Sequence, residues 1–184
     1  DALNGMGGVM ISKVFDGTNL EIVPLNFKLG EESLRSPNPL LDSNLQQTKD
    51  AVVSNRADFG VCLDGDADRC VFVDETGSVI RCDLMTALLC RYFLNGNSGS
   101  PVIYGLRSSR VVSEEIRAAG GLPRRERVGH SFIKKAMADS GAVFAGELSG
   151  HFYFRDNYNC DSAAIALATV AGVLSQQGRT LSEL

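Results

Sequence analysis

Three aspartates alternate with small residues in residues 64–69, which read Asp-Gly-Asp-Ala-Asp-Arg. Carboxylates this close repel one another, and Gly65 and Ala67 let the backbone curl so that the side chains converge. Such a cluster requires a cation, and an all-oxygen ligand set with open positions suits Mg²⁺ that also contacts a substrate phosphate. Arg69 adds a fork of donors that matches phosphate oxygens. The sequence therefore predicts a magnesium site made by Asp64, Asp66 and Asp68.

Two other motifs share this carboxylate spacing. A calcium-binding EF-hand loop needs glycine where this chain has Arg69 and a polar residue where it has Phe72, and helices rather than strands flank that loop. A phosphatase of the haloacid dehalogenase type would use Asp64 as the nucleophile and Asp66 as the general acid. We find no downstream acidic pair that completes this second motif. A solvated acidic turn is the structural alternative.

A second motif, residues 146–151, reads Gly-Glu-Leu-Ser-Gly-His between two predicted strands. Its two glycines permit a tight loop that presents Glu147 and Ser149 outward. A carboxylate that accepts from neighbouring hydroxyls, beside a hydroxyl side chain, is suited to holding a sugar ring. Taken alone, the motif is more often a simple hairpin turn, and the role of His151 is equally consistent with a structural one.

Two further residues stand where a predicted strand gives way to a helix. His130 follows the strand expected over residues 125–128, and Arg107 follows the strand expected over residues 102–104. Such junctions lie at the rim of an α/β sheet, where ligands bind. A lone histidine is more often a structural residue, so His130 is only a candidate on this argument.

Strands alternate with helices along the chain, which favours an α/β architecture with a largely parallel sheet and helices on both faces. A change in pattern near Arg81 predicts two domains, residues 1–81 and 82–184. Residues 31–39 contain two prolines and are expected to form a loop. The other expected strands are residues 20–24, 58–63, 70–73, 78–80, 142–145 and 152–154; the expected helices are residues 5–16, 42–55, 109–119, 131–139 and 161–176, with another that begins at Asp83.

The composition excludes several classes of protein. The chain has 184 residues, 44% of them hydrophobic, and 18 basic against 22 acidic residues give a net charge of −4. This balance argues against nucleic acid as a partner, and no apolar run is long enough to span a membrane. The five cysteines form no C-x-x-C pair and there are only two histidines, which disfavours a zinc site. Reduced thiols in the cytoplasm are the expected state.

The loop of residues 64–69, with the preceding residues 59–63 (Phe-Gly-Val-Cys-Leu), resembles the metal loop of the phosphohexomutases, the phosphomannomutase/phosphoglucomutase superfamily. Residues 146–151 are similar to the sugar-binding loop of that family. The resemblance implies two consecutive three-layer α/β/α domains with mixed, largely parallel sheets, the second and third domains of a four-domain enzyme. We therefore expect this chain to be the middle of a longer protein.

The resemblance also implies roles for individual residues. The three aspartates would hold Mg²⁺, and Arg69 would lie near the transferring phosphoryl group. Sugar hydroxyls would contact Glu147 and Ser149, with His151 closing the loop. The family has a histidine near the substrate at the position of His130, which suggests a proton shuttle. Many members carry lysine at the position of Arg107, and arginine cannot readily titrate, so charge stabilisation is its expected role.

The implied activity of the intact parent is reversible transfer of a phosphoryl group between a phosphoserine and the 1- or 6-oxygen of a hexose phosphate, through a hexose 1,6-bisphosphate. The substrate would be a mannose or glucose phosphate. Neither a serine loop of the Thr/Ser-x-Ser-His-Asn type nor a terminal Arg-x-Ser-Gly-Thr loop occurs in the sequence, so domains I and IV would have to supply them. The alternatives are a non-catalytic magnesium and sugar-phosphate binding module, or an aspartate-nucleophile phosphatase.

Overall fold

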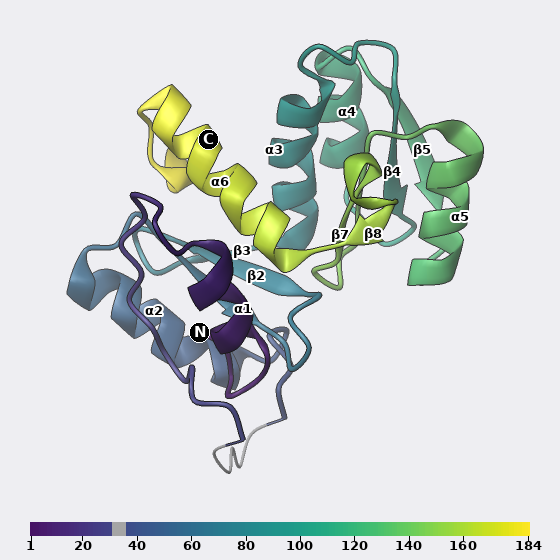
Figure 1. The fold of residues 1–184 in the computed structure, drawn as a ribbon. Coiled ribbons are helices and arrows are strands. Elements are labelled where there is room, and N and C mark those ends of the chain that lie inside the picture. Colours follow the sequence, from purple (N-terminus) through teal and green to yellow (C-terminus); the bar gives the residue numbers. More distant parts are fainter. Residues whose placement is uncertain (31–35) are drawn as a thin grey trace. The chain divides into compact units, whose positions relative to one another are not determined.

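The computed structural model of the chain describes residues 1–30 and 36–184. The chain forms two compact units, of which the first comprises Asp1–Ile80 and Ala163–Leu184 and the second Arg81–Ser162. Figure 1 shows the elements of each unit in sequence colours. The loop expected over residues 31–39 is irregular from Ser36 onward, and residues 31–35 lie outside the described residues. No helix in the described part of the chain is long and apolar enough to cross a membrane.

The first unit is built on an antiparallel sheet with the strand order β1-β2-β3. The strands are β1 (Phe59–Leu63), β2 (Cys70–Asp74) and β3 (Val79–Ile80). All five residues of β2 are buried, and the long helix α2 (Asp42–Asn55) packs against β1 and β2. Helices α1 (Gly7–Val14) and α6 (Ala163–Gln177) contact each other, and the short helix η2 (Leu181–Glu183) follows α6. The C-terminal residues therefore belong to the first compact unit.

The strand predicted over residues 20–24 is absent from the structure. This segment has no regular secondary structure and pairs with no strand of the described chain, and Leu20, Ile22 and Val23 are each more than a third exposed. A strand needs a hydrogen-bonded neighbour, so apolar residues alone are not enough. Helix α2 begins at the predicted residue, but its N-cap is Leu41, without a side-chain cap, and Val53 is exposed instead of facing the core.

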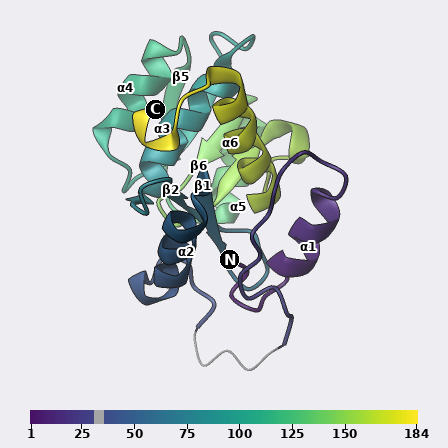
Figure 2. The same cartoon turned by 90° about the vertical axis from the view of Figure 1, so that its left-hand side faces the viewer.

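The second unit contains a mixed five-stranded sheet with the order β5-β4-β6-β7-β8. Strand β4 (Pro101–Gly105) runs parallel to β5 (Leu122–Glu126) and β6 (Phe144–Gly146). Strands β7 (Phe152–Phe154) and β8 (Cys160–Asp161) continue the sheet antiparallel, and the short helix η1 (Arg155–Asn157) joins them. Helices α3 (Cys82–Leu94) and α4 (Arg110–Ala118) cover one face and α5 (His130–Ser140) the other, as Figures 1 and 2 show. This is a three-layer α/β/α arrangement.

Close packing fixes β6 at the centre of this sheet. Its residues are fully buried, and the ring of Phe144 stacks on Phe93 of α3 with centroids 4.9 Å apart. A Cβ on Gly146 would lie 2.1 Å from the Oγ1 of Thr86, so only glycine lets α3 approach the strand here. On the other face, Ile133 and Met137 of α5 pack against Ile103 and Ala145. The start of the 146–151 loop is therefore held rigidly from both sides.

The predicted α/β fold with a mixed sheet is confirmed. Among the described residues, parallel pairing is limited to β4 with its two neighbours, and the other strand pairs are antiparallel, so the sheets are mixed but not largely parallel as expected. Strand β5 starts at Leu122 instead of residue 125, and β6 at Phe144 instead of residue 142. These shifts are of the size expected where strand ends are set by pairing partners instead of by local composition.

Candidate functional site

The acidic loop joins β1 to β2 and is organised by its own first carboxylate. The buried Oδ1 of Asp64 accepts hydrogen bonds from the backbone N–H groups of Asp68 (3.1 Å) and Arg69 (3.2 Å). The N–H of Ala67 donates to the Asp64 carbonyl at 3.3 Å, and Ala67 adopts a left-handed conformation with φ +65°. The chain therefore curls around Asp64, as the small residues predicted.

Arg69 neutralises the buried carboxylate of this loop. Its Nε donates to the Oδ2 of Asp64 at 2.6 Å, and the Asp64 side chain is only 2% exposed. Burial by itself raises the pKa of Asp64, but the hydrogen bonds from Arg69 and Asp68 and the positive charge of Arg69 outweigh it and hold that pKa below its ordinary value. Asp64 is therefore an anion at neutral pH.

The three aspartates can offer one cation a shared site. One carboxylate oxygen from each of Asp64, Asp66 and Asp68 lies within 4.8 Å of the other two. Asp66 is exposed and Asp68 half-buried, so the cluster opens to solvent. A carboxylate can accept about four hydrogen bonds. Asp64 accepts three, from the N–H groups of Asp68 and Arg69 and from the Nε of Arg69, so one acceptor position remains for a cation. Oxygen-only ligands with an open side fit Mg²⁺.

The acidic loop is braced by the turn that precedes α1. The N–H of Met6 donates to the carbonyl of Gly65 at 2.8 Å. A Cβ on Gly5 would lie 2.5 Å from the same carbonyl oxygen, so glycine is required for this close approach. The glycine-rich start of the chain therefore supports the acidic loop.

In the second unit, Glu147 follows β6 and is buried, not outward-facing as predicted. Its side chain is 4% exposed. The Oε1 atom accepts from the N–H of Gly129 at 3.0 Å, and Oε2 accepts from the hydroxyl of Tyr153 at 2.6 Å. The expected outward presentation is wrong because Tyr153 of β7 and the backbone of Gly129, just before α5, hold the carboxylate in a buried position.

The rest of the 146–151 loop is the tight turn that the sequence predicts. The N–H of Glu147 donates to the carbonyl of His151 at 3.0 Å, and Gly150 has φ +90°. The Oγ of Ser149 lies 2.9 Å from the Nδ1 of His151. His151 also lies 3.8 Å from the Oδ2 of Asp161 through its Nε2. His151 is therefore fixed between a hydroxyl and a carboxylate.

The carboxyl ends of β4, β5 and β6 meet at one edge of the sheet. Arg107 is exposed in the turn after β4, and His130 is the exposed first residue of α5. A Cβ built on Gly105 lies 3.9 Å from Glu147, and Gly129, with φ +123°, donates to that glutamate. Neighbouring parallel strands thus bring the junctions before Arg107 and His130 to Glu147.

Tyr153 is the residue of this site that the sequence analysis missed. It is fully buried in β7 between two phenylalanines, and its hydroxyl is bonded to Glu147. A hydroxyl in an otherwise apolar buried strand needs a partner, which is the signal that could have identified it.

Comparisons with known proteins give the same family that the acidic loop and the 146–151 loop indicate. Residues 1–77 match the model for phosphoglucomutase/phosphomannomutase, alpha/beta/alpha domain II, and residues 82–184 match the model for alpha/beta/alpha domain III. A phosphomannomutase from Escherichia coli (strain K12) is 40% identical over 148 residues, 80% of this chain and 32% of that protein. A phosphoglucomutase from Neisseria gonorrhoeae is 36% identical over 177 residues, 95% of this chain and 38% of that protein.

A similar solved structure is that of a phosphoglucomutase/phosphomannomutase family protein from Burkholderia thailandensis, with a TM-score of 0.91 and 30% identity over 96% of this chain and 39% of that one. The chain thus spans about a third of the length of the curated relatives it matches. The resemblance drawn from the motifs is confirmed. The chain belongs to the phosphoglucomutase/phosphomannomutase family, and it corresponds to domains II and III of that family.

Proposed function

We propose that the intact parent of this chain is a phosphohexomutase that moves a phosphoryl group reversibly between the 1- and 6-positions of a hexose phosphate. The group would pass through a phosphoserine and a hexose 1,6-bisphosphate. Mannose and glucose phosphates are both candidate substrates, because phosphomannomutases and phosphoglucomutases are both among the relatives. The convergence of three aspartate oxygens within 4.8 Å, in a chain of this family, is the observation that carries the proposal.

The proposed metal ligands are Asp64, Asp66 and Asp68. Mg²⁺ bound there would balance negative charge on the phosphoryl group. Asp64 contributes a fixed, ionised oxygen because Arg69 and the loop amides hold it in place. The Nε of Arg69 lies 3.9 Å from the Oδ1 of Asp68 in the same cluster, which supports a role for its guanidinium in stabilising phosphoryl oxygens.

The proposed sugar contacts are Glu147, Ser149 and His151. The two donors to Glu147 fix the plane of its carboxylate and leave acceptor positions for sugar hydroxyls. Ser149 and His151 lie in hydrogen-bond distance of each other, so each restricts the rotamer of the other. Such a prepared loop orients a sugar without large rearrangement.

His130 and Arg107 are proposed to act at the exposed edge of the same sheet. The imidazole of His130 can accept and donate a proton, so its proposed role is a proton shuttle for a sugar hydroxyl. The guanidinium of Arg107 would stabilise phosphate charge. Both are exposed at the ends of strands, where a ligand can reach them.

Transfer also needs a nucleophile and an anchor for the second phosphate, which we propose other domains of the parent supply. Positioning all of these groups together is what makes phosphoryl transfer fast. The present chain should therefore bind Mg²⁺ and hexose phosphate without turnover. A reducing cytoplasm is the proposed location, supported by five cysteines that are all thiols, four of them buried.

The test is titration calorimetry of the chain with Mg²⁺, and then with glucose and mannose phosphates, together with assays of mutase activity and phosphate release. We expect Mg²⁺ binding that Asp66→Asn weakens and that Asp16→Asn, an exposed aspartate outside the cluster, leaves unchanged. Failure to bind Mg²⁺ would contradict the proposal, and phosphate release by the chain alone would favour the phosphatase. Full-length parent carrying Asp66→Asn should lose turnover.

A further inference from the structure

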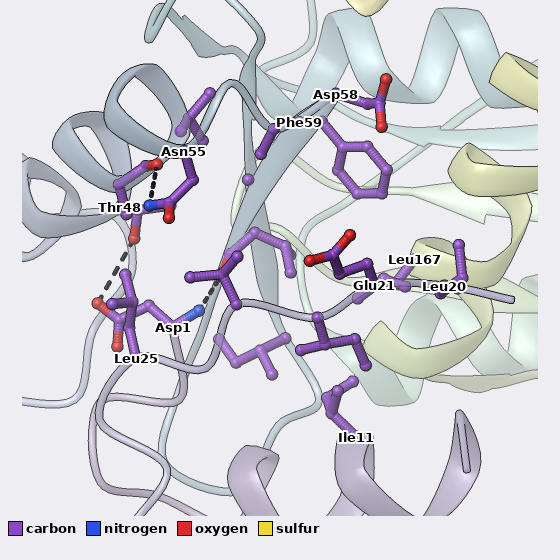
Figure 3. Close-up of a pocket in the computed structure, with 18 of the residues that line it drawn as sticks. Asp1, Ile11, Leu20, Glu21, Leu25, Thr48, Asn55, Asp58, Phe59 and Leu167 are labelled. Atoms are coloured by element: carbon purple, nitrogen blue, oxygen red, sulfur yellow. Dashed lines mark hydrogen bonds between the residues drawn. The ribbon is translucent and has the colours of Figure 1, made fainter. Parts of the chain in front are cut away.

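The cavity of the first unit has the wrong charge for a phosphorylated ligand. Its volume is about 430 Å³, and it lies between α1, α2, β1 and residues 19–27 (Figure 3). The described residues that line it include three carboxylates, those of Asp1, Glu21 and Asp58, against the Arg56 guanidinium and the Asp1 amine. A phosphate there would face more negative than positive charge, which disfavours its binding.

Two arginines at the carboxyl edge of the second unit's sheet offer the opposite charge. Arg107 follows β4 and Arg127 follows β5, and these strands pair in parallel with Gly105 opposite Glu126. The ladder continues one bond further, from the N–H of Leu106 to the carbonyl of Glu126 at 2.9 Å. In the part of the chain that the structure describes, neither guanidinium forms an ion pair with a carboxylate. Both positive charges therefore remain available to an anion.

Arg127 is held in place by an aromatic ring although it is exposed. Its guanidinium carbon lies 3.3 Å from the centre of the Phe132 ring. Stacking of this kind uses the face of the guanidinium plane and leaves the N–H donors at its edge for a bidentate pair with phosphate oxygens. The adjacent Glu126 accepts from the backbone N–H of Arg127 at 3.0 Å through its Oε1. Arg127 is therefore oriented without being neutralised.

The same ring connects this guanidinium to the sugar loop. A Cβ built on Gly129 lies 3.2 Å from the Cδ2 of Phe132, so the edge of the ring packs against Gly129. Gly129 in turn donates its N–H to the Oε1 of Glu147 at 3.0 Å. Two peptide units separate Arg127 from Gly129, so their Cα atoms are at most about 7 Å apart. Arg127 therefore lies within reach of a phosphate on a sugar held at Glu147.

We propose that Arg127 is a phosphate-binding residue of the hexose phosphate site and that Phe132 is the residue that positions it. The guanidinium would donate two parallel hydrogen bonds to the phosphate oxygens, and Arg107 from the neighbouring strand would supply a second positive charge. This inference rests on the proposed function, because it takes Glu147 as the sugar contact. It adds an anchor for the phosphate of the ligand within the second unit itself.

The other two arginines of β5 show what distinguishes Arg127 from an ordinary charged strand edge. Arg124 and Arg125 are exposed too, but they lie within the strand, opposite Ile103 and Tyr104, and not at its carboxyl edge. No aromatic ring of the described chain stacks on either of them. An unstacked arginine loses rotamer freedom when it binds an anion, whereas stacking has already restricted Arg127.

The experiment titrates the chain with glucose 1-phosphate, glucose 6-phosphate and unphosphorylated glucose, followed by NMR and without Mg²⁺. Arg127→Met should weaken the tighter-binding phosphate about tenfold and leave the weak binding of glucose unchanged, because methionine covers Phe132 but donates no hydrogen bond. Arg127→Lys keeps the charge without the planar fork and should restore only part of the affinity. Phe132→Leu should weaken phosphate binding severalfold. Arg125→Met is the matched control and should bind like the original chain.

Equal affinities of Arg127→Met and the original chain for the sugar phosphate would overturn the proposal. An equal loss in Arg125→Met would overturn it too, since general positive charge and not an oriented guanidinium would then account for binding. Glu147→Gln separates this inference from the proposed function. A loss in Arg127→Met without a loss in Glu147→Gln would support the phosphate contact and contradict the sugar contact. Failure of the original chain to bind either phosphate would contradict both.

Discussion

The acidic loop of the first unit and the sugar loop of the second each contain one buried carboxylate, and the two are stabilised differently. Asp64 is bonded to a guanidinium and two backbone N–H groups. Glu147 is bonded to a phenol and one backbone N–H, which are neutral. Burying a carboxylate costs free energy unless hydrogen-bond donors replace the lost water, so these donors hold both carboxylates in place.

This difference matches the ligands that we propose for the two loops. In the acidic loop, three aspartates and one arginine leave two negative charges, the number that a divalent cation balances. In the sugar loop, neutral donors orient Glu147 without cancelling its charge, so it can still accept strongly from hydroxyls. The first loop is therefore built around charge balance and the second around hydrogen-bond direction.

The largest expected effect is that of Asp64→Asn. The amide nitrogen of asparagine would face the Nε of Arg69, and a guanidinium would lose its anionic acceptor. We expect a loss of about 3 kcal/mol in the free energy of unfolding, and loss of Mg²⁺ binding with it. Urea unfolding with and without Mg²⁺ measures both. A stable variant that binds Mg²⁺ normally would show that charge balance does not organise the loop.

Asp83→Asn tests whether the loss of an ionic pair by itself lowers the free energy of unfolding, at a residue outside the proposed metal and sugar sites. Asp83 is fully buried and accepts from Arg81 through both oxygens, and also from the N–H of Ser109. We expect the second unit to lose about 2 kcal/mol. The Mg²⁺ affinity of this variant should not change. If it falls, lower stability alone reduces Mg²⁺ binding, and the loss of binding in Asp64→Asn would not identify Asp64 as a ligand.

The difference in stability between wild type and Asp83→Asn should depend on pH in a defined direction. Burial raises the pKa of Asp83, but the hydrogen bond from Ser109 and the Arg81 guanidinium lower it more, so the folded pKa is below its ordinary value. Asp83 therefore stabilises the fold above the pKa of the unfolded chain, about 3.9, and this contribution is lost as the pH falls through the lower folded pKa. The difference between wild type and variant in urea unfolding should shrink between pH 5 and pH 2, roughly.

Tyr153→Phe tests the neutral pairing of Glu147. The buried Oε2 would lose its phenol donor, at a cost of about 1.5 kcal/mol in stability. Because the carboxylate would then be free to turn, hexose phosphate affinity should also fall, whereas Mg²⁺ affinity should not. Tyr104→Phe, in β4 of the same sheet, is the matched control. Unchanged sugar affinity in a folded Tyr153→Phe variant would show that Tyr153 is only structural.

Local sequence predicted most elements of the fold, because the apolar pattern was strong where the residues are buried. Helix α2 and strand β1 lie within one residue of their predicted bounds. The two-residue strand β3 lies within the predicted residues 78–80, whereas the two-residue strand β8 was not predicted, since its pairing with β7 and not its composition defines it. Residues 20–24 failed for the opposite reason: the composition is typical of a strand, but the described chain supplies no partner.

For the candidate site, sequence predicted the backbone geometry of both loops better than the side-chain directions. The small residues of the acidic loop and the glycines of residues 146–151 do produce tight turns. The predicted direction of the Glu147 side chain was wrong, because that direction depends on Tyr153 in β7 and on Gly129 before α5. Long-range donors of this kind leave no pattern in the residues next to the glutamate.

Asp66→Asn should separate ligation from stability in the acidic loop. Asp66 is exposed, so stability should change by less than about 0.5 kcal/mol. Loss of one anionic ligand should weaken Mg²⁺ binding about tenfold, which corresponds to 1.4 kcal/mol. Calorimetry on the variant measures this. Together with Asp64→Asn, it tests whether the buried and exposed aspartates have different tasks.

The smallest expected effect is that of Ser149→Ala in the sugar loop. Its hydroxyl is bonded to His151 at a partly exposed position, so removing it should cost about 0.5 kcal/mol in stability or less. If hydrogen-bond direction is the principle of this loop, hexose phosphate binding should still weaken severalfold, because His151 loses its orienting partner and the sugar loses a contact. Ser162→Ala, outside the loop, is the control for affinity. Equal affinities for Ser149→Ala and wild type would leave Glu147 as the residue through which the loop recognises a sugar. The difference between the two loops would then be the difference between the carboxylates of Asp64 and Glu147.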